Sequence, residues 1–118
     1  MDPGRAAELL AAERARIEEH LSRLDAEFDP TTREGDLSDD HDYGDRAADL
    51  TERERDLGRI EELREELAAI ARAEQRLAEG TYGLSIVSGE PISARRLERL
   101  PAAERTAEEQ RLFERGLL

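Results

Sequence analysis

Hydrophobic residues recur at helical spacing along the middle of the chain. They are separated by steps of three, four and seven residues, so they fall on one side of a helix. The stripe is narrow and bordered by Glu and Arg, which is typical of the seam of a two-helix coiled coil rather than of a helix on a globular core. Its positions are Leu50, Leu57, Ile60, Leu63, Leu67, Ile70 and Leu77, and Glu74 interrupts the series.

A second stripe nearer the N-terminus supplies a partner for this helix. Arg14 takes the seam position between two apolar residues, where its stem could lie along the seam or its charge could specify the register. Pro30 ends the helix, because proline cannot continue the helical hydrogen bonds. The apolar positions of this stripe are Leu10, Ile17, Leu21, Leu24 and Phe28.

The two stripes predict a long antiparallel coiled-coil hairpin over residues 1–79. The first helix is expected over about 4–29 and the second over about 45–79, with an acidic, polar loop over 30–44 at the tip. A helix of that length is too long for one compact domain of this size. We therefore expect the N-terminal end of the second helix to project into solvent.

Residues 80–118 follow as a small lobe. Gly80 is placed to cap the long helix, and the run TYGLSIVSGEPI indicates two short strands or a knuckle. A final helix is expected from about Ala102, so the protein is predicted to be mainly α-helical. The candidates for the core of the lobe are Tyr82, Leu84, Ile86, Val87, Ile92, Leu97, Leu100, Leu112 and Phe113.

Charge narrows the range of partners. The 118 residues carry a formal net charge of −12, and all 18 basic residues are Arg. Unassisted binding to duplex DNA or to an anionic membrane is not expected, whereas a basic protein surface is a suitable partner.

The absence of Cys excludes disulfides and thiolate metal sites. No signal peptide, membrane span or lipidation motif is apparent, so a cytoplasmic protein is expected.

Two motifs at matching separation resemble the bacterial DksA/TraR family. The tip sequence DYGDRA is similar to the family's DxxDRA, and the lobe is similar to its C-terminal zinc finger, YGxCxxCGxxI followed by RRLxAxPxAxxCxxC. The resemblance implies a coiled-coil hairpin and a zinc-finger-like lobe. The matching lobe residues are Gly80, Tyr82, Gly83, Ser88, Gly89, Glu90, Pro91, Ile92, Arg95, Arg96, Leu97, Glu98, Pro101 and Ala102.

The chain departs from the family at every zinc ligand. The four ligand positions fall on Ser85, Ser88, Thr106 and Glu109. Three hydroxyls and one carboxylate are poor zinc ligands compared with thiolates. We therefore expect a degenerate, metal-free lobe that rests on its apolar residues and on hydrogen bonds among Ser85, Ser88, Thr106 and nearby backbone.

The resemblance also implies a function. Family members insert the coiled coil into the secondary channel of bacterial RNA polymerase, where acidic tip residues modulate initiation without direct DNA contact. The matching tip residues here are Asp42, Asp45 and Ala47, with Arg46 in a supporting role.

Some family members respond to the alarmone guanosine tetraphosphate through basic side chains. The matching positions are Ala69, Leu100 and Gln110, which cannot pair with phosphates as Lys or Arg do. Weak or absent alarmone binding is therefore expected.

Several signals have a second interpretation. The acidic cluster around Asp36 and Asp45 could hold a divalent cation, although a solvated acidic loop is favoured because the spacing does not fit an EF-hand. Arg95 and Arg96 could contact an acidic rim of the polymerase or another anionic partner, and a salt bridge with Glu90 or Glu98 is an equal alternative.

The sequence also bears on functions other than transcription regulation. No catalytic motif appears, so an enzyme is not expected. The alternative function is a degenerate paralogue that acts as a coiled-coil interaction module or channel competitor without regulatory output. A monomer is expected, and a homodimeric coiled coil is a third interpretation.

Overall fold

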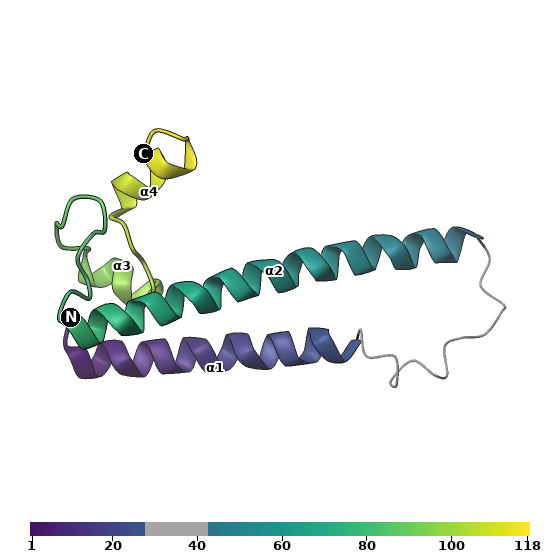
Figure 1. The fold of residues 1–118 in the computed structure, drawn as a ribbon, viewed down its shortest axis with the longest axis horizontal. Coiled ribbons are helices and arrows are strands. Elements are labelled where there is room, and N and C mark those ends of the chain that lie inside the picture. The colour runs from purple at the N-terminus through teal and green to yellow at the C-terminus, as the bar shows by residue number, and fades with distance from the viewer. Residues whose placement is uncertain (28–42) are drawn as a thin grey trace. The chain divides into compact units, whose positions relative to one another are not determined.

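The computed structural model describes residues 1–27 and 43–118, and this part of the chain is mainly helical, as predicted. Helices α1 (Pro3–Glu27) and α2 (Tyr43–Glu79) are long, and α3 (Ala94–Arg99) and α4 (Ala107–Glu114) are short (Figure 1). The described residues contain no strand beyond an isolated antiparallel bridge between Leu84 and Pro91. None of the helices in these two ranges is long and apolar enough to cross a membrane.

The chain forms two compact units. Met1–Ala15 and Leu67–Leu118 make up the first, which we call the lobe unit, and Arg16–Glu66 makes up the second, which we call the hairpin unit. In each unit a length of α1 lies beside a length of α2 (Figure 1). The division into a hairpin over 1–79 and a lobe over 80–118 stays a prediction.

The hairpin unit is held by a thin apolar seam. Ile17 and Leu21 of α1 and Ile60 and Leu63 of α2 are buried, as the two stripes predict. Leu57, in contrast, is 52% exposed. The cause is the unequal length of the helices, since α1 has 25 residues and α2 has 37. The first turns of α2 therefore have no described residue of α1 opposite them.

The lobe unit has an apolar seam of its own, in which Ala6 and Leu10 are buried together with Ile70 and Ala73. The two polar residues that interrupt the apolar stripes in the sequence are paired with each other. Arg14 Nε donates a hydrogen bond of 3.0 Å to Glu74 Oε1, and Arg14 Nη2 forms an ion pair with the same oxygen. The chain thus places its two seam interruptions opposite one another.

Glycine ends α2 as predicted. Gly80 has a φ of +81°, in the left-handed region, and the Thr81 N–H donates to the Arg76 carbonyl over 2.9 Å. Gly83 has a φ of +84°, and a Cβ there would lie 3.4 Å from Leu97 Cδ1. The lobe therefore starts from two positions that favour glycine.

The predicted core of the lobe is largely wrong. Ile92 and Leu97 are buried and Tyr82 is half-buried, but the other six candidates are exposed. The lobe is too small to enclose them, because a short chain buries a smaller share of its surface. Phe113, 45% exposed, is covered on one face by the Arg105 guanidinium, 3.7 Å from the ring centroid. The exposed candidates are Leu84, Ile86, Val87, Leu100, Leu112 and Phe113.

Candidate functional site

The predicted tip lies at the start of α2. Asp42 is outside the described residues, and α2 begins at the next residue, Tyr43. Asp45 and Arg46 belong to the first turns of this helix, and the structure describes their backbone only. Ala47 is exposed on the same helix. Three of the four predicted tip residues therefore share the N-terminal end of α2.

The four positions that match family zinc ligands lie together in the lobe. Ser85 Oγ donates a hydrogen bond of 2.6 Å to Glu109 Oε1, which joins the turn after α2 to helix α4. Ser88 accepts a bond of 3.3 Å from the Glu90 N–H, and Thr106 caps α4. Hydrogen bonds thus connect the two halves of the lobe, which are the turn after α2 and helix α4. They do so at the positions that match the family's zinc ligands.

Ser85 is the centre of the first half. It is only 5% exposed, and its hydroxyl oxygen accepts bonds from the N–H groups of Val87 at 3.0 Å and Ser88 at 3.2 Å. The Gly89 N–H closes the same turn on the Ser85 carbonyl at 2.9 Å. One buried hydroxyl therefore organises the turn and binds the opposite carboxylate.

Thr106 and Glu109 form a capping box at the start of α4. Thr106 Oγ1 accepts from the Glu109 N–H at 3.2 Å, and Glu109 Oε1 accepts from the Thr106 N–H at 2.9 Å. The bond from Ser85 and the one from the Thr106 backbone are the main causes that lower the pKa of Glu109 from 4.5 to about 2. Glu109 is consequently ionised at neutral pH and acts as an acceptor.

These residues do not fit a structural zinc ion. Zinc sites of this kind use thiolate and imidazole ligands, whereas this cluster offers three hydroxyls and one carboxylate that is already bonded to donors of the chain. Within residues 1–27 and 43–118, no group of three His, Cys, Asp or Glu side chains could hold a metal ion. The cluster acts as a hydrogen-bonded cross-link.

A second cross-link in the lobe unit centres on Glu104. Its carboxylate accepts from Arg72 Nη2 at 2.7 Å and forms a longer contact of 3.4 Å with Arg76. Its backbone carbonyl accepts from the Ile86 N–H at 2.9 Å. Partial burial raises the pKa of Glu104, but the hydrogen bond and charge of Arg72 and the charge of Arg76 outweigh it, so the pKa is lowered. No sequence motif marks this residue.

One interpretation of Arg95 and Arg96 is a salt bridge with a nearby glutamate of the lobe, and the described part of the chain does not show it. Glu98 instead binds Arg5 of α1, with Arg5 Nη2 to Glu98 Oε2 at 3.0 Å. The side chain of Arg96 donates from Nε to the Arg105 carbonyl at 3.0 Å. Within the described ranges, neither Arg95 nor Arg96 forms an ion pair with Glu90 or Glu98.

The three positions that match family alarmone contacts carry no cation. Ala69 is half-buried on α2, and Leu100 is exposed at the end of α3. Gln110 donates to Glu114 over 3.2 Å along α4. None of the three could form an ion pair with a phosphate.

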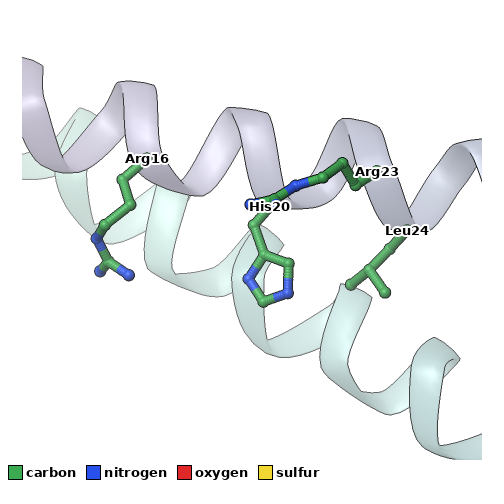
Figure 2. Close-up of a pocket in the computed structure, with 4 residues that line it drawn as sticks. All are labelled: Arg16, His20, Arg23 and Leu24. Atoms are coloured by element: carbon green, nitrogen blue, oxygen red, sulfur yellow. The ribbon is translucent and has the colours of Figure 1, made fainter.

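A shallow groove of about 300 Å³ lies along α1 in the hairpin unit. Figure 2 shows its four lining residues, Arg16, His20, Arg23 and Leu24, on successive turns of that helix. Its lining contains no carboxylate or nucleophile to complement the histidine, so it offers no acid–base or nucleophilic pair. His20 is half-buried there.

Comparison with known proteins gives similarities in sequence and in fold. No protein-family model matches the chain. It is 43% identical over 76 residues to YteA of Bacillus subtilis, a protein described as uncharacterized, and this match covers 63% of the chain and 31% of YteA. It is 36% identical over 74 residues to the RNA polymerase-binding transcription factor DksA of Caulobacter vibrioides, covering 63% of the chain and 52% of DksA. The chain thus spans about half or less of the length of these relatives.

The fold resembles a solved structure over nearly the whole chain. Transcription factor DksA2 from Pseudomonas aeruginosa matches with a TM-score of 0.75 and 28% identity, over 96% of this chain and 83% of that one. The match includes the coiled-coil hairpin and the lobe.

Proposed function

We propose that this chain, a DksA-like protein in both sequence and fold, binds a bacterial RNA polymerase and regulates transcription. The observation that carries the proposal is the similarity to a protein named as an RNA polymerase-binding transcription factor, at 36% identity. The fold supports it, since the match to DksA2 covers 96% of the chain. The protein would act by binding and not as an enzyme.

The finer mechanism assigns the contact to the tip of the hairpin. In this proposal the coiled coil enters the secondary channel and presents Asp42, Asp45 and Ala47 near the catalytic centre, with Arg46 supporting them. Carboxylates there can engage basic or magnesium-organised elements through charge-assisted bonds, and a small residue permits close approach. The exposure of Ala47 and the narrow seam of Ile60 and Leu63 support a slender, accessible coiled coil.

The lobe would act without zinc in this proposal. The Ser85–Glu109 bond supplies a link that does not require metal. Weak or absent alarmone synergy is proposed as well, because Ala69, Leu100 and Gln110 lack a positive charge. Direct DNA binding is not part of the proposal, and the protein is expected to be a cytoplasmic monomer.

The test compares binding and transcription for the same set of proteins. Binding to core RNA polymerase is measured by fluorescence anisotropy of the labelled chain, with a transcript-cleavage factor that uses the secondary channel as competitor. Asp42→Asn with Asp45→Asn should abolish the effect on transcription initiation and leave most of the binding. The matched control is Asp25→Asn with Glu61→Gln, which removes the same two charges from exposed positions and should regulate normally.

Each outcome selects one function. Competition for the channel, together with loss of regulation in the tip variant alone, supports the proposal. Binding without any effect on initiation selects the alternative, a degenerate paralogue that occupies the channel, which the lost zinc ligands and lost basic contacts favour. Absence of binding at micromolar concentration would overturn both.

A further inference from the structure

A groove between α3 and α4 is lined by four of the six arginines of residues 80–118. Its volume is about 490 Å³. Three of its arginines come from α3 and the fourth from α4, so the groove exists only because the chain folds these two short helices together. It is lined by Ser93, Arg95, Arg96, Arg99, Leu100, Ala107 and Arg111.

Most of these arginines have no partner within the lobe. Arg96 is held through its Nε by the Arg105 carbonyl. The side chains of Arg95, Arg99 and Arg111 make no hydrogen bond or ion pair in the described part of the chain. The chain has 30 acidic residues and only 18 arginines, so it does not lack carboxylates to pair with them. Three unpaired guanidinium groups around one groove are therefore notable in an acidic protein.

The arrangement also works against local stability. Arg95 and Arg99 stand four residues apart on α3, and like charges at that spacing destabilise a helix. Arg111 adds a third positive charge to the same groove from α4. An anion bound among them would remove this repulsion.

We propose that the α3–α4 groove binds a short acidic segment of a partner protein that also carries an apolar side chain. Arginine pairs with carboxylates through two parallel hydrogen bonds, and four guanidinium groups suit two or more carboxylates. Leu100 is 53% exposed beside them and offers an apolar contact, a mixture found where arginine anchors a protein interface. This binding is independent of the tip and does not require that the partner be RNA polymerase.

Nucleic acid fits the groove less well than an acidic peptide. Duplex DNA carries a charge about every 1.7 Å and is bound by extended basic surfaces. Here Glu98 adjoins Arg99 on α3, and Glu108 and Glu114 stand on either side of Arg111 along α4. Phosphates beyond the groove would meet these carboxylates, whereas a short acidic segment would not extend to them.

The experiment uses the full chain and a short fluorescein-labelled peptide of glutamate and leucine residues. Anisotropy at low ionic strength should show saturable binding that weakens with added salt. Arg95→Gln with Arg99→Gln should weaken it at least about tenfold, because two charge-assisted contacts are lost. The control, Arg55→Gln with Arg64→Gln, removes two exposed arginines of the hairpin unit and should leave the affinity within about twofold.

Circular dichroism establishes that both double variants keep their helical content. An unlabelled peptide with glutamine in place of glutamate should fail to compete, which shows that carboxylates are required. No binding of the glutamate peptide, or an equal loss in the two double variants, would overturn the proposal. Stronger competition by a DNA oligonucleotide or by pyrophosphate would overturn it too, and would assign the groove to phosphate. A failure of polymerase binding leaves this result unaffected, so the two proposals are tested separately.

Discussion

Replacing Ser85 with alanine removes the hydroxyl that joins the two halves of the lobe. The side chain is 5% exposed, so water cannot readily substitute for it. The substitution deletes the bond to Glu109 and leaves the N–H groups of Val87 and Ser88 without their acceptor.

The size of the effect follows from these bonds. The two backbone N–H groups alone cost about 2 kcal/mol, at roughly 1 kcal/mol for each net hydrogen bond. Loss of the 2.6 Å bond to Glu109 adds to this cost. For a chain of this size, about 2 kcal/mol corresponds to a fall in Tm of roughly 8 °C or more.

Thermal unfolding followed by circular dichroism measures the fall in Tm. Hydrogen exchange shows where in the lobe the stability is lost, because the amides of Val87 and Ser88 should both exchange faster in Ser85→Ala. Ser88→Ala is the matched control, since its hydroxyl accepts a weaker bond of 3.3 Å from the exposed Glu90 N–H, and it should cost less than about 1 kcal/mol. Equal Tm values for the two variants would refute the central role of Ser85.

Two other predictions concern the acid stability of the lobe and the seam of the hairpin. The pKa of Glu109 falls from 4.5 to about 2 on folding, so its contribution to stability is complete above pH 4.5 and is lost as the pH falls toward 2. Urea midpoints of wild type and Glu109→Gln should therefore differ at neutral pH and converge in that window, and a gap independent of pH would contradict the assignment. Leu63→Ala should cost about 2–5 kcal/mol because Leu63 is fully buried, whereas the half-exposed Leu57→Ala should cost less than about 1 kcal/mol by the same urea assay. Similar losses in the two leucine variants would argue against the observed seam.

The two long helices could be predicted from the sequence because the spacing of apolar residues along each helix is a local periodicity. Ile60 and Leu63 lie in the seam as predicted, and Gly80 ends α2 as predicted. The exposure of Leu57 could not be predicted, since it depends on where α1 ends relative to α2. Burial in a seam is a property of two helices together.

The lobe was less predictable than the hairpin. Its apolar residues Ile86 and Val87 are expected in a core but are about half exposed, and the buried residue of that turn is Ser85, whose hydroxyl accepts from the Val87 N–H. The family resemblance locates the Ser85 cluster, but it does not predict the central role of Glu109 as the hydrogen-bond acceptor of that cluster. The pattern T-x-x-E at Thr106–Glu109 is a capping-box signature and could have revealed it.

No comparable sequence pattern marks the contacts of Glu104 or the α3–α4 groove. Arg72 and Glu104 are far apart in the sequence, and only the folded chain brings them within 2.7 Å. Arg111 likewise joins Arg95 through the packing of two short helices. Such sites depend on tertiary placement, which single-sequence patterns do not encode.

The pair of Arg14 and Glu74 has a consequence for the choice of partner helix. A seam made only of leucine, isoleucine and alanine would accept any helix with a similar stripe. Two copies of α1 packed in parallel would set Arg14 against Arg14, and the like charges would repel. Folding back onto α2 instead gives Arg14 a carboxylate, at 3.0 Å from its Nε. The most polar point of the seam thus makes α1 selective for the second helix of its own chain over a parallel copy of itself.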